Sequence, residues 1–269
     1  MPTELLLALS GLAAGAFGAM LGLGGGILIV PILTLGFGLP LSAAVGTSLV
    51  CVIATSTGAA AVNVRAGRAD VRLGMTLGAG TVVGALTGAL VAGLLSERVV
   101  AALFAALLGY TAFTMLQRLL GGEAEAADAP TDDPAAPDGP GAPAYRSNRV
   151  TAALGGSFVA GNVSGLLGVG GGIVTVPLVH LVMGAPMRVA VATSNFMIGI
   201  TAAAGAWAYL FRGDIDPRQA APMVVGVALG AALGASLGGR VRARWLTGAF
   251  VVVVGYVAIQ MALRAAGAG

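Results

Sequence analysis

The chain has 269 residues, of which 57% are hydrophobic and only 9% are charged, and its formal net charge is +3. Soluble domains carry about 25% charged residues, so this composition excludes a soluble globular protein and predicts an integral membrane protein. The single cysteine, Cys51, excludes an intramolecular disulfide framework and a multi-cysteine zinc site. The single histidine, His180, argues against a histidine-based catalytic or metal centre. We therefore predict no enzymatic activity, no cofactor and no bound metal.

All fourteen basic residues are arginines, and they are scattered between apolar runs. This distribution argues against nucleic-acid binding and is typical of the charges that orient helices in a bilayer. The first twenty residues are apolar, but they include Glu4 and no positive charge. We interpret them as mature protein and not as a signal peptide.

Residues 121–148 separate two apolar units, 1–120 and 149–269. This segment holds six of the eleven acidic residues and five of the twelve prolines. It cannot bury enough apolar surface to offset its ordering entropy, so we predict a disordered, acidic, proline-rich linker.

The two units match at a constant offset of 146 residues. Gly15–Pro31 and Gly161–Pro177 are identical at nine of 17 positions, and Pro40–Ser48 is similar to Pro186–Ser194. Glycines spaced four apart recur at the same offset, as Gly80, Gly84 and Gly88 against Gly226, Gly230 and Gly234. The chain is therefore one unit written twice.

Each unit contains four apolar segments. They cover about 3–35, 41–64, 73–95 and 98–120 in the first unit, and about 150–183, 187–211, 219–239 and 245–266 in the second. A membrane helix needs about 20 apolar residues, so three segments per unit fit one crossing each. The first segment is too long, and GLGGG or GVGGG interrupts it. Each glycine weakens a helix interior by about 1 kcal/mol relative to alanine, so we predict a break there.

We therefore expect an all-α polytopic membrane protein with two homologous repeats, each made of a broken first segment and three transmembrane helices. If the first segments cross once, the repeats are parallel and the arginines divide nine against five. If they enter and return, the repeats are inverted and the division is ten against four. The positive-inside rule favours inverted repeats, with both termini outside and the 121–148 segment in the cytoplasm.

Broken helices in corresponding positions of inverted repeats are typical of secondary transporters. A helix that restarts after a break presents backbone N–H groups without intrahelical partners, and these attract anions. Hydroxyl and amide side chains can donate to the same anion without burying a charge. The predicted substrate-binding residues are Gly24, Gly25, Gly26, Thr47, Ser48, Asn162, Ser164, Gly170, Gly171, Gly172, Thr193, Ser194 and Asn195.

Each of these features also has a purely structural explanation. Glycine ladders and membrane hydroxyls commonly serve helix packing. His180 either relays protons or is hydrogen-bonded at a helix end, Cys51 fits simple packing, and Asp70 is placed to cap a helix. No carboxylate lies well inside an apolar segment, since Glu4 is at the edge of the first one, which argues against a cation site.

The paired motif Gly-x-Gly-Gly-Gly-Ile, followed by Val-Pro, at Gly22–Leu33 and Gly168–Leu178 resembles the TauE/SafE family of bacterial and archaeal membrane transporters. The stretches Pro40–Ser48 and Pro186–Ser194 fit the same family. The resemblance implies a multi-pass permease of the cell membrane that moves sulfite, sulfonates or related sulfur-containing anions.

The leading interpretation is a secondary transporter that moves a small sulfur-containing anion by alternating access between the halves. An anion channel and a transporter of another small organic anion remain alternatives. A membrane enzyme is disfavoured because the sequence has no nucleophile–base pair. The expected partners are the anion and the lipid bilayer, and a homodimer is left open.

Overall fold

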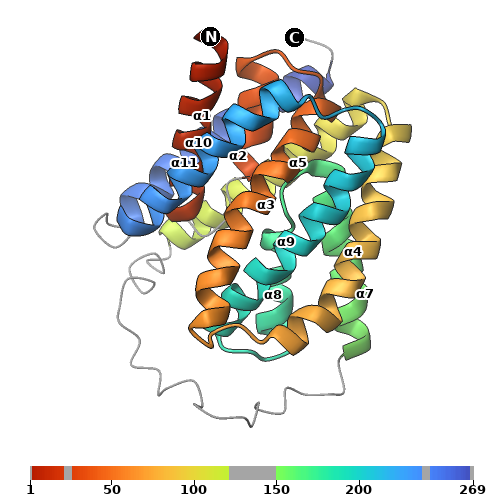
Figure 1. Cartoon of the computed structure of the whole chain (residues 1–269), viewed down its shortest axis with the longest axis vertical. Helices are drawn as coiled ribbons and strands as arrows, with labels where there is room; N and C mark the ends of the chain where they lie inside the picture. Colours follow the sequence, from red (N-terminus) through yellow and green to blue (C-terminus); the bar gives the residue numbers. More distant parts are fainter. Residues whose placement is uncertain (1, 21–25, 121–149, 238–242, 267–269) are drawn as a thin grey trace.

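The computed structural model describes residues 2–20, 26–120, 150–237 and 243–266, and helices form the regular secondary structure in these ranges (Figure 1). Seven described helices are long and apolar enough to cross a membrane by length and composition. The prediction of an all-α polytopic membrane protein is confirmed. The predicted linker 121–148 and the candidate residues Gly24 and Gly25 lie outside the described residues.

The two units contain the same succession of helices. The first has α1 (Pro2–Met20), α2 (Gly26–Pro31), the π-helix η1 (Ile32–Gly36), α3 (Leu41–Arg65), α4 (Val71–Leu94) and α5 (Glu97–Leu120). The second has α7 (Val150–Leu167), α8 (Gly172–Pro177), the π-helix η3 (Leu178–Val182), α9 (Met187–Phe211), α10 (Pro217–Leu237) and α11 (Ala243–Ala265). From α2 onward, each helix begins 146 residues before its counterpart, so the sequence offset is also a structural one.

The first apolar segment of each unit is divided into two helical parts. α2 and η1 run back along α3, because Gly26 lies beside Val52 near the middle of α3, whereas Gly36 leads into the turn before Leu41. Figure 1 shows α1 and α3 beginning at the same end of the molecule. The segment therefore enters the helix bundle and returns to the end from which it started.

Glycine and proline explain the second break. Gly168, Gly170 and Gly171 have φ angles of 72°, 83° and 76°, a region that side chains with a Cβ rarely adopt. Pro177 then ends α8, and the chain continues as η3. Because proline lacks an N–H and clashes with the preceding turn, the regular α-helical bonding pattern gives way to the wider π-helix here.

Helices of the two units interleave. α1 packs against α10 and α7 packs against α4, while α3 pairs with α9 and α5 pairs with α11. A Cβ on Gly84 would overlap the carbonyl oxygen of Phe158, and one on Gly230 would overlap that of Leu12. The glycine ladders thus bring helix backbones into contact, as predicted. The two repeats form one body because α1 of the first packs on α10 of the second, and α7 of the second packs on α4 of the first.

The contacts also give the direction of each pair. Along α1 and α10 the meeting residues are Ala8 with Gly226, Leu12 with Gly230, and Ala16 with Gly234. Along α3 and α9 they are Gly46 with Tyr209, Leu49 with Gly205, and Ser56 with Gly199. α1 and α10 therefore run in the same direction, whereas the counterparts α3 and α9 run antiparallel.

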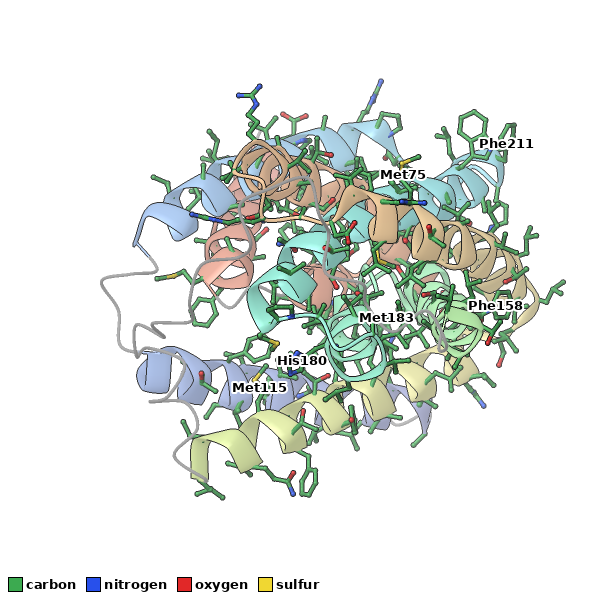
Figure 2. The ribbon with its side chains drawn as sticks, turned by 90° about the horizontal axis from the view of Figure 1, so that it is seen from below. Met75, Met115, Phe158, His180, Met183 and Phe211 are labelled. Carbon is green, nitrogen blue, oxygen red and sulfur yellow. The ribbon has the colours of Figure 1, made fainter. Side chains whose placement is uncertain are left out.

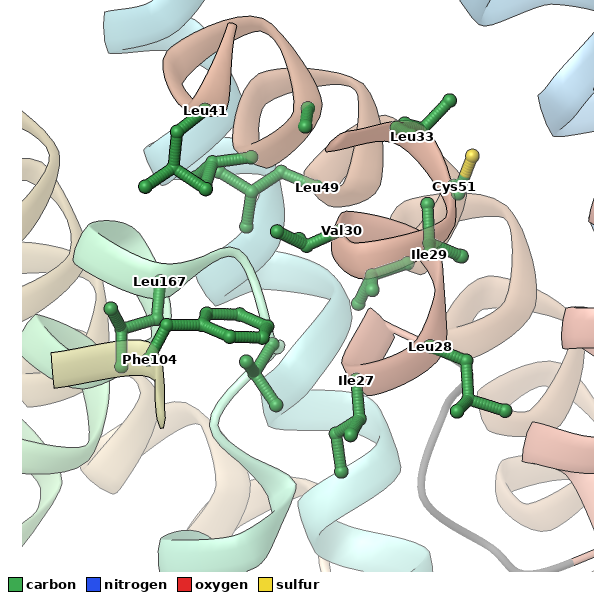
Figure 3. Close-up of a cluster of buried hydrophobic side chains, with 14 of the residues drawn as sticks. Ile27, Leu28, Ile29, Val30, Leu33, Leu41, Leu49, Cys51, Phe104 and Leu167 are labelled. Carbon is green, nitrogen blue, oxygen red and sulfur yellow. The ribbon is translucent and has the colours of Figure 1, made fainter. Parts of the chain in front are cut away.

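The apolar core surrounds α2 (Figure 3). Ile27, Ile29 and Leu33 belong to the same cluster of buried side chains as Leu49 of α3. Cys51 is fully buried in the same cluster, so the prediction that it serves packing is confirmed. Large apolar side chains also cover the outside, and Phe211 is 73% exposed there, as the lipid-facing surface of a membrane protein requires.

Two polar side chains serve the ends of helices. In Figure 2, His180 lies inside the bundle. Its Nδ1 is 2.8 Å from the Ala185 carbonyl oxygen, and Nδ1 must donate because a carbonyl only accepts. Asp70 accepts a hydrogen bond from the Leu73 N–H at 2.9 Å and so caps α4. Of the two roles considered for His180, the structure shows the hydrogen bond at a helix end.

Candidate functional site

The two glycine breaks meet at one buried serine. The Ser48 hydroxyl of α3 donates to the Gly168 carbonyl oxygen at 2.8 Å, and the Gly26 carbonyl oxygen lies 3.3 Å away. A Cβ on Gly26 would lie 3.0 Å from the Gly168 oxygen and 3.1 Å from the Val169 oxygen. We call Gly26, Ser48, Gly168 and Val169 the junction. It joins the restart of the first broken segment to the break of the second.

The second break is lined by apolar groups and by one free hydroxyl. A Cβ on Gly170 would lie 2.8 Å from Val52 and 3.1 Å from Ile198, and one on Gly172 would lie 2.9 Å from Ile198. A Cβ on Gly171 would be 3.7 Å from the Ser164 Oγ. Three of the predicted glycines therefore lie in a tight wall beside the junction.

Two of the predicted serines are buried without a hydrogen-bond partner among the described residues. Ser164 and Ser194 are 0% exposed, and their Oγ atoms are unpaired there. Ser194 is the counterpart of Ser48, which is paired. A buried hydroxyl without a hydrogen-bond partner lowers the free energy of unfolding by about 1–3 kcal/mol. These hydroxyls are therefore available to donate to a ligand.

A cavity of about 500 Å³ lies between α1, α3, α9 and α10. Its polar lining consists of Thr55, Ser56, Asn63 and Asn195. We call it the Asn195 cavity. Ile198 also lines it and contacts Gly170 and Gly172, so the cavity reaches the wall of the second break.

A second cavity of about 520 Å³ lies near the other end of α3. Glu97, Tyr209, Arg212 and Asp214 line it together with Val45 of α3. We call it the Arg212 cavity. A Cβ on Gly168 would lie 3.0 Å from Val45, so this cavity approaches the junction from the opposite direction.

One face of α3 connects the two cavities. Its residues follow helical spacing, with Leu41 and Val45 in the Arg212 cavity, Ser48 at the junction, and Ser56 in the Asn195 cavity. Side chains three or four residues apart share a helix face. The arrangement is a stripe along α3, with one cavity toward each end and the tightly packed junction between them.

The other predicted residues have different surroundings. The Asn162 amide donates to the Thr87 hydroxyl at 3.0 Å and therefore faces α4. The Thr193 hydroxyl accepts from the Asp70 N–H at 3.0 Å, at the turn before α4. Thr47 is buried, 1% exposed. Asn195 is the predicted amide that lines a cavity.

The cavities also contain residues that sequence analysis did not select. Tyr209 and Arg212 stand in the Arg212 cavity where the first unit has Asn63 and Ala66 at the 146-residue offset. Because many other positions match at this offset, the difference is visible in the sequence and could have marked Tyr209 and Arg212 as candidates. Within the described helices, the acidic residues Glu4 and Glu97 lie in first turns. An ion at the stripe along α3 would therefore meet hydroxyl groups, amide groups and backbone groups. Near the middle of the stripe it would meet no carboxylate of the described residues.

Comparison with known proteins identifies the family of the chain. The model of the family described as sulfite exporter TauE/SafE matches residues 7–261. The chain is 27% identical over 228 residues to the probable membrane transporter protein YunE of Bacillus subtilis (strain 168), covering 82% of this chain and 83% of that protein. No solved structure matches. The chain belongs to the TauE/SafE family, and it is a multi-pass membrane protein of a transporter family.

Proposed function

We propose that this TauE/SafE protein is a secondary transporter that moves a small sulfur-containing anion, such as sulfite or an organosulfonate, across the cell membrane by alternating access. The observation that carries the proposal is the stripe along α3. It joins two cavities that approach the junction from opposite ends. A channel or transporter needs such a path, and an isolated ligand pocket does not.

The chemistry of the stripe supports an anionic substrate. Donor groups at or beside it include the amide of Asn195 in its cavity and the Ser164 hydroxyl near Gly171, which has no partner among the described residues. A cation would need counter-charges inside the membrane, and the described helices carry their carboxylates in first turns. The description of the family as sulfite exporters supports sulfur as the central atom.

Alternating access requires two halves that can move against each other around a shared site. Inverted repeats supply this, because one arrangement exchanges the roles of the two halves. The antiparallel course of α3 and α9, which correspond at the 146-residue offset, supports inverted repeats here. The return of each first segment to its starting end supports them as well.

The arginine distribution supports one orientation in a bacterial or archaeal cell membrane. With returning first segments, the inverted topology assigns ten arginines, including Arg65 and Arg72, to one side of the membrane and four, including Arg212 and Arg264, to the other. By the positive-inside rule the first end faces the cytoplasm. Both termini are then outside, and the 121–148 segment is cytoplasmic.

A two-stage experiment tests the function. Purified protein is first heated with sulfite, thiosulfate, sulfate, sulfoacetate, taurine or chloride, because a ligand at 100 times its dissociation constant stabilises by about 2.7 kcal/mol. The anion that raises the melting temperature is then offered to proteoliposomes. Accumulation against its own gradient, driven by an ion gradient, is the expected result.

Two other results would each change the assignment. Flux that only dissipates the anion gradient would replace the transporter with a channel. Stabilisation by chloride and transport of chloride, with no response to any of the sulfur compounds, would reject the substrate class while leaving the path in place.

A further inference from the structure

The space that forms the Asn195 cavity has a counterpart at the 146-residue offset, and buried side chains fill that counterpart. Applying the 146-residue offset to the Asn195 cavity relates Asn63 to Tyr209, Asn195 to Leu49, and Ile198 to Val52. Tyr209, Leu49 and Val52 are all buried, with at most 1% of each exposed. A cavity lined by two amides thus corresponds to a packed cluster built around a tyrosine.

Tyr209 ties together three helices at that point. Its hydroxyl donates to the Gly165 carbonyl oxygen of α7 at 3.0 Å, three residues before Gly168, the first glycine of the second break. Its ring lies against α3, where a Cβ on Gly46 would be 3.1 Å from the Tyr209 Cβ. The side chain therefore fills the space between α3, α7 and its own helix α9.

Arg212 holds this tyrosine in place. Its guanidinium carbon lies 4.3 Å from the centre of the Tyr209 ring, a favourable cation–π distance. Arg212 also pairs with Asp214 at 2.7 Å and donates to the Ala89 carbonyl oxygen of α4. The first unit has Ala66 at the corresponding position, so this latch is present on one side of the molecule.

The location of Tyr209 gives it a role in transport. It lines the Arg212 cavity and bonds to Gly165 next to the second break. Val45 lies beside it, between the same cavity and Gly168. Tyr209 and Val45 therefore line the side of the Arg212 cavity that faces the second break.

We infer that Tyr209 is the gate of the Arg212 cavity, latched by Arg212, and that this gate is closed in the structure. The inference rests on the proposed transport path. The gate belongs to one side of the molecule, because the first unit has Asn63 and Ala66 at the positions that correspond to Tyr209 and Arg212.

Cysteine labelling tests the gate without requiring transport. In a Cys51→Ala background, Ser42→Cys reports the Arg212 cavity and Asn63→Cys reports the Asn195 cavity, since each residue lines the cavity named. A membrane-impermeant thiol reagent applied to right-side-out and inverted vesicles shows the side on which each opens. Ser164→Cys, buried near Gly171, reports the space behind the gate.

Tyr209→Ala is expected to raise the labelling rate of Ser164→Cys by about tenfold or more, only in the vesicles that label Ser42→Cys. Arg212→Gln, which removes the latch but keeps the ring, is expected to give a smaller rise of roughly threefold to tenfold, the range that loss of one cation–π contact allows. Phe250→Ala is the matched control. It removes an equally buried aromatic side chain on α11 and is expected to leave the rate unchanged.

Unchanged labelling in Tyr209→Ala, with normal labelling of Asn63→Cys as evidence of folding, would overturn the gate. An equal rise in Phe250→Ala would also overturn it, because the effect would then be general loosening. Transport by the wild type together with unchanged labelling rejects the gate alone. Faster labelling in a protein that transports no anion supports the gate and rejects the proposed function.

Discussion

The helix pairs α1–α10 and α4–α7 differ sharply from the α3–α9 pair that lies with them in the bundle. In the first two pairs the helix backbones touch at glycines. The α3–α9 pair instead carries Ser48, Asn63, Asn195 and Tyr209, and it borders both cavities. The comparison indicates a division of labour. Two close-packed pairs form a scaffold, and the third pair forms the path.

The largest effect is expected where the scaffold is broken directly. Gly84→Val would place side-chain atoms on the Phe158 carbonyl, and such overpacking costs about 3 kcal/mol or more when backbone is the neighbour. We expect loss of the monodisperse peak in size-exclusion chromatography. Gly109→Val, which adds its Cβ where nothing lies within 4 Å, is the matched control and should keep that peak.

Substitutions in the path should change ligand binding more than the free energy of unfolding. Asn195→Leu removes the cavity amide and is expected to abolish the ligand-induced stabilisation, which amounts to about 2.7 kcal/mol at 100 times the dissociation constant. Asn162→Leu removes an amide that is bonded to Thr87. It should keep the ligand response while stability falls by about 1 kcal/mol. Equal ligand responses in the two variants would refute the assignment of the cavity.

Ser48 and Ser194 allow a comparison of two corresponding residues. Ser48 has a hydrogen-bond partner, whereas Ser194 has none among the described residues. Ser48→Ala leaves the Gly168 carbonyl without its donor, so unfolding should become easier by about 1–3 kcal/mol. Ser194→Ala removes a buried hydroxyl without a partner among the described residues and should leave the free energy of unfolding unchanged or raise it by up to about 1–3 kcal/mol. Thermal melting of the two variants without ligand gives the values. The opposite ranking would show that Ser194 has the structural role.

The smallest effect is expected at a helix end. Asp70→Ala removes the side-chain acceptor for the Leu73 N–H, and loss of such a cap costs about 1 kcal/mol. Ligand binding should be unaffected because Asp70 borders neither cavity. Arg72→Ala, one residue inside the same helix, provides the control in the same melting experiment. A loss of ligand response in Asp70→Ala would extend the site to the turn before α4.

Much of the scaffold could be predicted from sequence because its signals are local or periodic. The offset of 146 residues gave the paired helices, the glycine runs gave the breaks, and the four-residue spacing of Gly84 and Gly88 gave the close packing. Asp70 lies where a helix cap belongs, and its cap is present. These features need little knowledge of what lies across the molecule.

The path was harder to predict because its partners come from the other unit. Asn162 carried the expected buried amide, but α7 packs on α4 and the amide is satisfied there by Thr87. Ser48 reaches the carbonyl of Gly168, 120 residues away. The replacement of Asn63 by Tyr209 could be read from the repeat. Its meaning depends on the cavity that only the folded chain defines.

The interleaving of the two units also has a consequence for the order of synthesis. α1 is among the first parts of the chain to be made, yet its packing partner α10 belongs to the second unit. At about 5–20 residues per second, roughly 200 residues of further translation take about 10 to 40 seconds. During that time the α1 glycines have no α10 backbone to contact, so lipid or the insertion machinery must shield the helix. The nascent first half is therefore a folding intermediate. Its helix packing is complete only when the last quarter of the chain enters the membrane.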